Sequence, residues 1–391
     1  MVERRLLLHA GMPKTGTSAL QAAFARNERL LEAAGVHHPE GGAHRRALRG
    51  KVTAGNAGPL TPWLRGGDEP SRDEVATWLD DLLGQTPAGA DRVLISSETC
   101  FYAVVERATA LRELLAERGC GLEALVLVRD AVPWTVSTYG QHVQRLGHAG
   151  SLAQWVEQFR HVYADWRTRL TTLREVLGPE SLTVLHYDSH RADLVGHVFA
   201  EVLGVPTATP PRQDAPVNRT LGAREVAWMR EVNASIDDVD RARGVGNVLL
   251  KGEPLVGDVP LRAGRAEAAR IAELAEPHVA WVNDTFFHGG PVLGTGLDAA
   301  ADADVDTAAS VTLGDDERAA LGLAVHLAER LPRGSGVDAE VAELRGRLQE
   351  ERRRRRAAER RLRRVEVEDP DTSTPDEPSP GRWRAALRRR R

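Results

Sequence analysis

The sequence contains little cysteine, very little lysine and no long apolar run. Its 391 residues include two cysteines, Cys100 and Cys120, too few for a disulfide-stabilised fold, which favours a reducing compartment. No stretch of eighteen or more apolar residues predicts a membrane span, and the segment after Met1 lacks the apolar region of a signal peptide. We therefore expect a soluble cytoplasmic protein, with peripheral contact at the inner face of the membrane left open.

Charge is distributed unevenly along the chain. The net charge is -4, yet residues 338–391 hold 17 arginines against 12 acidic residues, which leaves the remainder strongly acidic. This asymmetry indicates a C-terminal appendage with its own surface chemistry. Only three of the 52 basic residues are lysines, namely Lys14, Lys51 and Lys251, so a lysine inside a motif is informative.

The hydrophobic pattern alternates between strands and helices over the first 205 residues. Strands are expected over residues 5–10, 93–96, 124–128 and 182–186, and helices over 17–34, 108–118 and a segment ending near 203–204. Residues 36–70 have no clear period and are expected to be loop. Continuous apolar strands separated by helices are typical of a parallel sheet buried on both faces. The sequence thus predicts an α/β fold: a three-layer, P-loop-like parallel sheet flanked by helices, with a C-terminal helical and coiled-coil appendage.

Composition divides the chain into five parts. We expect a domain over residues 1–290, a linker over 291–311, a helical segment over 312–336, a short coiled coil over 337–367, and a disordered acidic, proline-containing segment with a basic tail over 368–391. The coil predicts a homo-oligomer. The arginine-rich tail is either a solvated surface or a contact with an anionic membrane surface or another polyanion.

A candidate phosphate loop lies between the first strand and the first helix. It reads Gly11-Met12-Pro13-Lys14-Thr15-Gly16-Thr17-Ser18. Free N–H groups and the dipole at a helix N-terminus favour an anion, and lysine and hydroxyl side chains add charge and donors. In a Walker A loop the lysine directly follows the last glycine, whereas Lys14 precedes Gly16. The alternative is a strand–turn–helix junction with an incidental lysine.

The segment from Pro13 to Ser18, followed by Leu20-Gln21, resembles the 5′-phosphosulfate loop of the sulfotransferases that use 3′-phosphoadenosine-5′-phosphosulfate (PAPS). The resemblance is greatest to the bacterial and carbohydrate branch of that family and extends over residues 5–290. It implies PAPS as co-substrate, 3′-phosphoadenosine-5′-phosphate (PAP) as product, and no metal. On this basis Pro13, Lys14, Thr15, Gly16, Thr17 and Ser18 are expected to bind the co-substrate.

The same resemblance implies a second phosphate site. In the family an arginine ends a central strand and a serine follows eight residues later, and together they bind the 3′-phosphate. Arg129 and Ser137 have this spacing. The position also suits the edge of a parallel sheet where ligands collect. The Arg-Lys-Gly segment that cytosolic sulfotransferases use as a further 3′-phosphate clamp has no counterpart here, which leaves open what completes the nucleotide site.

Three residues are the candidates for catalysis. Lys14 is expected to stabilise charge on the bridging oxygen as PAP leaves. Glu98 follows the second expected strand and is the first candidate for the general base, although a structural ion pair is about as plausible for it. His44, in a glycine-rich segment, is the second candidate, against the simpler reading of a solvated loop histidine. His37, His38 and His142 are weaker alternatives, and their spacing shows no zinc pattern.

Three classes of function fit the sequence. The first is a PAPS-dependent sulfotransferase that modifies a hydroxyl or amine, with a carbohydrate or glycolipid as the acceptor that the resemblance suggests. The second is a phosphotransferase with an unusual phosphate loop. The third is a non-catalytic sulfonucleotide-binding or coiled-coil scaffold protein. Nothing indicates specific binding of nucleic acid.

Overall fold

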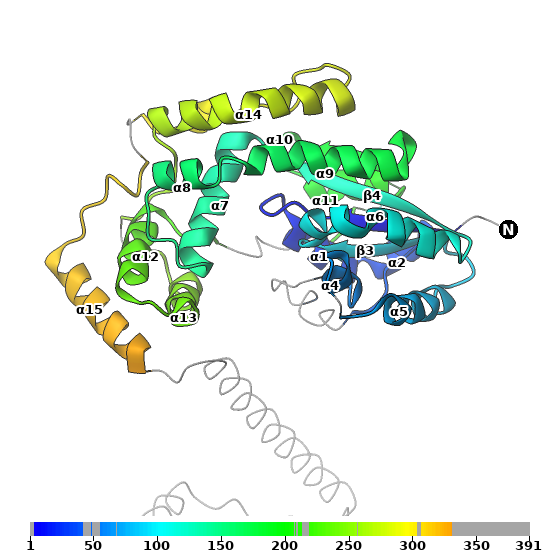
Figure 1. The fold of residues 1–391 in the computed structure, drawn as a ribbon, viewed down its shortest axis with the longest axis horizontal. Helices are drawn as coiled ribbons and strands as arrows, with labels where there is room; N and C mark the ends of the chain where they lie inside the picture. The colour runs from blue at the N-terminus through cyan, green and yellow to red at the C-terminus, as the bar shows by residue number, and fades with distance from the viewer. Residues whose placement is uncertain are drawn as a thin grey trace, which may run out of the picture. The chain divides into compact units, whose positions relative to one another are not determined.

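The computed structural model describes residues 4–330, apart from 42–47, 49–54, 68, 207, 209, 213–218, 256 and 303–305. The chain divides into two compact units, residues 1–330 and 331–391. His44, the expected coiled coil over 337–367 and the tail over 368–391 lie outside the described residues. Figure 1 shows the helices and strands of the first unit.

The first unit is built on one parallel sheet of five strands in the order β2-β3-β1-β4-β5. Its strands are β1 (Arg4–Ala10), β2 (Val36–His37), β3 (Arg92–Ser97), β4 (Cys120–Val128) and β5 (Leu182–His186). The four strands expected from the sequence are present, and β2 adds two residues at one edge, within the segment expected to be loop. Since all strands run parallel, their carboxyl ends meet at one edge of the sheet.

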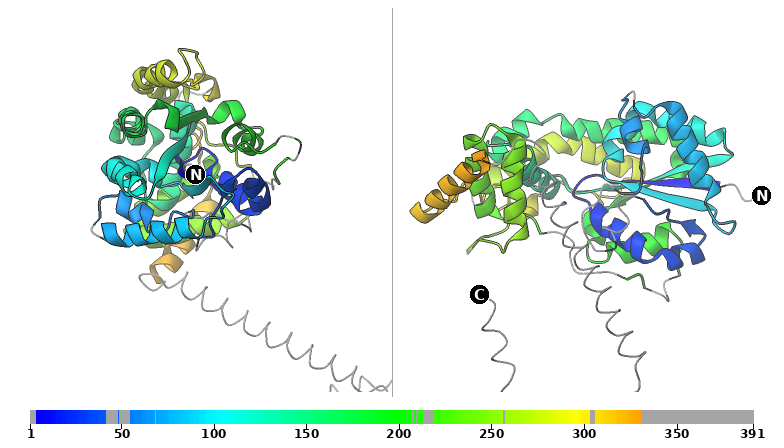
Figure 2. Two further views of the ribbon diagram at one scale, coloured as in Figure 1. Left: turned by 90° about the vertical axis from the view of Figure 1, so that its right-hand side faces the viewer. Right: turned by 90° about the horizontal axis from the view of Figure 1, so that it is seen from below.

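Helices cover both faces of the sheet, which confirms the three-layer α/β class (Figures 1 and 2). They are α1 (Thr17–Arg26), α2 (Glu28–Ala33), α4 (Leu60–Leu64), α5 (Arg72–Gly84), α6 (Cys100–Ala116), α7 (Ala131–Arg145), α8 (Leu152–Gln158), α9 (Val162–Leu177), α10 (Tyr187–His190), α11 (Leu194–His197), a π-helix (Val198–Val202), α12 (Ala223–Ser235), α13 (Val239–Lys251), α14 (Arg265–Phe286) and α15 (Asp315–Arg330). Among these described helices, none is long and apolar enough to cross a membrane.

The alternation of side chains along β1 explains the two hydrophobic cores. Leu6 and Leu8 pack into a large cluster with residues of α4 to α9 and α14, whereas Leu7 packs into a smaller one with residues of α1, α11 and the π-helix. Successive strand residues point to opposite faces, so a continuous apolar run supplies both cores.

The helix expected over residues 17–34 is two helices, and Asn27 marks the break. Its Nδ2 donates to the carbonyl oxygen of Ala23 at 2.8 Å, and its φ of -114° leaves the helical range. The same side chain bonds both backbone groups of Arg212, donating at 3.1 Å and accepting at 2.8 Å. The apolar period continues through Asn27, so only this long-range contact reveals why the helix stops there.

Residues 291–311, expected to be a linker, pack on the domain where they are described. Leu293 and Ala308 are buried. The N–H of Ala301 donates to the carbonyl oxygen of Ala263 at 2.7 Å, and that of Thr307 to Arg262 at 3.0 Å. The compact unit continues through this segment into α15.

Candidate active site

The loop between β1 and α1 has the backbone geometry of an anion-binding turn. Lys14 and Gly16 both lie in the left-handed region, with φ of 67° and 81°. Inside the loop, Thr15 Oγ1 donates to the carbonyl oxygen of Met12 at 2.6 Å. A Cβ atom at Gly16 would lie 2.5 Å from Cδ2 of Leu194, so both the backbone angle and the packing require glycine. Turns with such residues can make successive N–H groups converge on an anion.

Several donors of this loop have no partner within the described part of the chain. Among the described residues, the backbone N–H groups of residues 14–18 donate no hydrogen bond, and no side chain caps α1. Thr17 Oγ1 is buried and also without a partner. Buried polar groups are normally hydrogen-bonded, and the first N–H groups of a helix need an acceptor. A phosphate group would satisfy all of them at once.

Lys14 sits in a positive environment. Burial lowers the pKa of Lys14 most, the charges of Arg145 and Arg129 act in the same direction, and the charge of Glu98 opposes them; together they bring the pKa to about 8. Lys14 is therefore still protonated at neutral pH, but its charge is poorly compensated. An anionic ligand would relieve this cost.

Arg129 joins the two phosphate sites expected from the sequence. Its Nη1 donates to the backbone carbonyl oxygen of Lys14 at 3.0 Å and to Ser137 Oγ at 3.2 Å. The helix that carries Ser137 is attached to the loop a second time, because Trp134 Nε1 donates to the carbonyl oxygen of Pro13 at 3.1 Å. The two strand–helix junctions thus lie side by side, close enough for one ligand to reach both.

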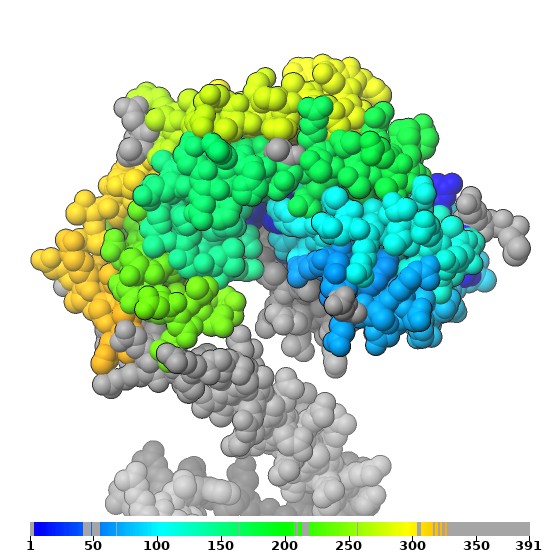
Figure 3. Space-filling view, viewed as in Figure 1, coloured from blue at the N-terminus to red at the C-terminus, as the bar shows by residue number. Residues whose placement is uncertain are grey.

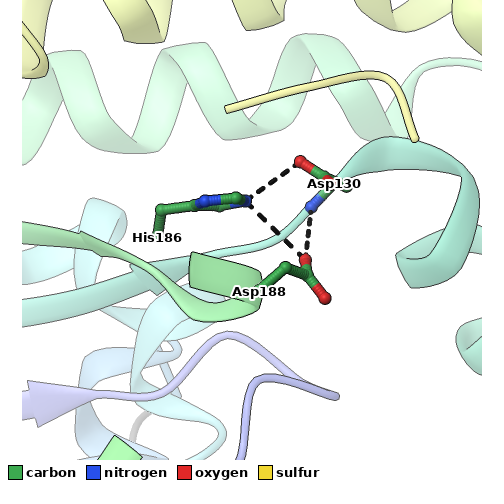
Figure 4. A group of neighbouring side chains, drawn as sticks. All are labelled: Asp130, His186 and Asp188. Atoms are coloured by element: carbon green, nitrogen blue, oxygen red, sulfur yellow. Dashed lines mark hydrogen bonds and ion pairs between the residues drawn. The ribbon is translucent and has the colours of Figure 1, made fainter. Parts of the chain in front are cut away.

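Next to Arg129 in the structure lies a polar cluster of the buried His186 and the half-buried Asp130 and Asp188 (Figure 4). His186 Nε2 lies 2.9 Å from Asp130 Oδ1, and the N–H of Asp130 donates to Asp188 Oδ2 at 3.0 Å. The other oxygen of Asp188 is 3.5 Å from Arg129 Nε. His186 Nδ1 bonds Ser189 Oγ at 2.7 Å. Three ligand-type side chains meet here, but each already has protein partners, and the positive charge beside them is that of Arg129.

Glu98 has a carboxylate that is available for chemistry. It directly follows β3, is half-buried, and lies close enough to Lys14 for its charge to raise the pKa of that lysine. Within the described part of the chain, Glu98 makes no side-chain hydrogen bond and no ion pair. The structural ion pair that was the alternative for Glu98 is thus not seen among the described residues.

The candidate histidines are placed less favourably where they are described. His142 Nδ1 accepts a hydrogen bond from Trp155 Nε1 at 3.0 Å, and burial lowers the pKa of His142 to about 4. Burial also lowers the pKa of His37, whose strand β2 is at the sheet edge. The ring of His38 packs on Phe24. His44 stays a prediction, since it lies outside the described residues.

Arg145 is a residue of this site that the sequence did not reveal. It lies in the last turn of α7, eight residues or about 12 Å of helix beyond Ser137. It is half-buried, and its charge lowers the pKa of Lys14 more than that of Arg129 does. It makes no ion pair within the residues described. The only signal for it in the sequence is its place near the end of the helix that begins at Ala131, directly after Arg129 and Asp130.

The space-filling view shows a hollow between α7 and α13 on one side and α4 and α6 on the other (Figure 3). Blue atoms of the N-terminal segment are visible at its upper end. Two large apolar side chains are exposed nearby in the chain: Leu146, which directly follows Arg145, and Val248, which lies on α13.

Three solved structures are similar to this chain. The sulfotransferase from Alicyclobacillus acidocaldarius is 14% identical over 73% of this chain and 96% of its own, with a TM-score of 0.39. A retinol dehydratase in complex with androsterone and inactive cofactor PAP has 12% identity, 73% and 82% coverage, and a TM-score of 0.31. The sulfotransferase domain from the curacin biosynthetic pathway has 14% identity, 71% and 98% coverage, and a TM-score of 0.29. No protein-family model matches the chain, and no curated protein matches it significantly.

Proposed function

We propose that this protein transfers the sulfuryl group of PAPS to a hydroxyl or amine of an acceptor, which is a carbohydrate or glycolipid. The observation that carries the proposal is the hydrogen bond between Arg129 and the backbone of Lys14, because it puts two anion-binding junctions next to each other. A nucleotide phosphorylated at both its 3′ and 5′ positions has two anionic ends to match them.

The two junctions bind different phosphate groups of the nucleotide. The unpaired N–H groups of the loop and the buried Thr17 hydroxyl hold the 5′-phosphate. Arg129 and Ser137 hold the 3′-phosphate, for which a guanidinium and a hydroxyl are suitable donors. PAPS supplies an activated sulfuryl group attached to its 5′-phosphate oxygen.

Transfer requires alignment, proton removal and charge stabilisation. Glu98, or His44 in its place, accepts the proton from the hydroxyl or amine of the acceptor. The lone pair of that oxygen or nitrogen forms the new bond to sulfur. The bond from sulfur to the 5′-phosphate oxygen breaks. Lys14 stabilises the negative charge on that oxygen, and PAP leaves. Lys14, Arg129 and Arg145 already carry positive charge here, and this charge stabilises the negative charge that develops on the leaving oxygen.

Binding and transfer can be tested separately. Titration calorimetry should show that PAP binds the full chain without added metal, and that ATP with Mg²⁺ binds at least tenfold more weakly. Incubation with ³⁵S-labelled PAPS and cell extract should then label an acceptor, and Lys14→Ala should abolish labelling. Consumption of ATP with Mg²⁺ would support a phosphotransferase instead. Tight PAP binding with no labelled product would support a scaffold protein.

A further inference from the structure

A C-terminal segment crosses the start of α7 and supplies its missing hydrogen bonds. We call residues 293–296 the C-terminal strap. The N–H of Val132 donates to the carbonyl oxygen of Thr295 at 2.9 Å, and that of Ala131 to Gly294 at 3.4 Å. In return, the N–H of Gly294 donates to Asp130 Oδ1 at 2.7 Å. The first N–H groups of α7 are thus satisfied by the strap.

The strap is fixed to α14 by one side chain. Asn283 donates from Nδ2 to the carbonyl oxygen of Leu293 at 2.8 Å and accepts from its N–H at 2.9 Å. Leu293 itself is buried. A Cβ atom at Gly294 would lie 3.3 Å from Asp130 Oδ1, so the carboxylate would have to shift to make room for it. The backbone of the strap is therefore held firmly against Asp130.

Asp130 connects the C-terminal strap to Arg129 through Asp188. Burial raises the pKa of Asp130, but hydrogen bonds from His186 and Gly294 outweigh burial and hold it below its usual value, so the carboxylate stays charged. The backbone N–H of Asp130 is bound by Asp188, whose second oxygen lies beside Arg129 Nε. The chain of contacts runs without a gap from Asn283 to the guanidinium.

These contacts leave one part of the guanidinium unused. Nη1 donates to the backbone of Lys14 and to Ser137, and Nε faces Asp188 at 3.5 Å. Within the described residues Nη2 has no partner. Arginine has a rigid planar fork, so fixing Nη1 and Nε also fixes the direction of the two N–H groups on Nη2.

We infer that the C-terminal strap, Asp130, His186 and Asp188 are positioning elements that make the protein selective for nucleotides with a 3′-phosphate. They act through Arg129, by holding its Nη2 donors in the direction of that phosphate before the ligand arrives. Such preorganisation raises affinity because fewer side-chain rotamers are lost on binding. The inference rests on the proposed function, since it assigns the 3′-phosphate to Arg129.

The test compares two ligands that differ only in the 3′-phosphate. PAP and adenosine 5′-monophosphate are titrated into the full chain and into the variants Asn283→Ala, Gly294→Ala and Asp188→Asn. Each variant should lower the affinity for PAP about tenfold or more and change the affinity for adenosine 5′-monophosphate less than about twofold. Asp188→Asn is the mildest change, because its amide oxygen can still accept from Asp130. Asn247→Ala, which removes a single weak contact on α13, is the matched control and should alter neither affinity.

Hydrogen exchange gives a second measurement that does not need a variant. PAP should slow exchange at the N–H groups of Gly294 and Val132 more than adenosine 5′-monophosphate does, because binding at Arg129 and order in the strap are reciprocal. Equal losses for both nucleotides in the variants, or no loss for either, would overturn the positioning role while leaving the sulfotransferase proposal intact. Wild-type protein that binds PAP no more tightly than adenosine 5′-monophosphate would overturn both.

Discussion

Arg129 Nη1 lies 3.0 Å from the backbone carbonyl oxygen of Lys14, although 115 residues separate the two in the chain. One arginine thereby links the junction after β1 to the junction after β4, the neighbouring strand. The arrangement follows from parallel pairing, which brings both carboxyl ends to the same edge. A single nucleotide can therefore bridge two motifs that are distant in sequence.

Removing either donor to the 3′-phosphate should lower the affinity for PAP, and Arg129 should matter more than Ser137. We expect Arg129→Ala to reduce PAP affinity about 100-fold, because it removes a mostly buried charged donor. Ser137→Ala removes one hydroxyl and should cost about tenfold. Titration calorimetry measures both. Arg72→Ala is the control, since Arg72 is half-exposed and pairs with Glu117 away from the site. A loss in the control equal to that in Arg129→Ala would contradict specific binding.

The left-handed turn at Gly16 should not tolerate a side chain. Gly16→Ala adds a Cβ atom at φ of 81°, 2.5 Å from Leu194, and should destabilise the fold by about 1–2 kcal/mol and abolish detectable PAP binding. Gly84→Ala is the matched control, because a Cβ atom there meets nothing within 4 Å at the end of α5. Urea denaturation and calorimetry compare the two. Full PAP binding by Gly16→Ala would show that this loop does not hold the phosphate.

Activity should decline on the alkaline side because of Lys14. Its pKa is lowered to about 8, so in the free enzyme the ammonium group loses its proton as the pH rises through that value. We expect kcat/KM for PAPS to fall above about pH 8, as this ratio reports the free enzyme. Lys14→Arg should lower kcat, since the guanidinium is planar and delocalised, but also remove the alkaline decline. An unchanged decline in Lys14→Arg would assign it to another group.

Two neighbours should move this alkaline decline in opposite directions. The charge of Glu98 raises the pKa of Lys14 and that of Arg145 lowers it. Glu98→Gln should therefore shift the decline to lower pH, and Arg145→Gln should shift it to higher pH.

If Glu98 is also the general base, its variant should lose about 10²–10⁴-fold in kcat with PAP affinity changed less than threefold. Equal losses of kcat and PAP affinity would instead assign Glu98 a structural role.

The charge on Lys14 should also cost stability. Its folded-state pKa is lowered, so the unfolded chain holds the proton more tightly between pH 8 and 10.5, and stability rises with pH over that range. At pH 7, Lys14→Met should raise the melting temperature by a few degrees, about 2–4 °C, while abolishing transfer. Differential scanning fluorimetry should show the gain shrinking as the pH approaches 10.5. A lower melting temperature would mean that packing of the lysine outweighs its charge.

Local patterns were enough to name candidate residues for the site. Residues 11–18 are contiguous at the junction of β1 and α1, so their spacing predicts a shared role, and Arg129 and Ser137 lie close together where β4 leads into α7. The apolar strands were readable for a similar reason, because burial on both faces leaves a continuous hydrophobic run. Helix boundaries were less readable, as at Asn27, where a contact with Arg212 ends a helix whose period continues.

Sequence patterns predicted the parallel α/β class and the position of the candidate phosphate loop, since each depends on residues close together in the chain. Tertiary structure alone decided that Asp130, His186 and Asp188 support Arg129, and that Asn283 fixes a strap against Asp130. Asp130 lies 56 residues from His186 and 164 residues from Gly294, with no period or spacing to connect them. Packing of the sheet and its helices brings them together, and only then do their charges and hydrogen bonds act on the site.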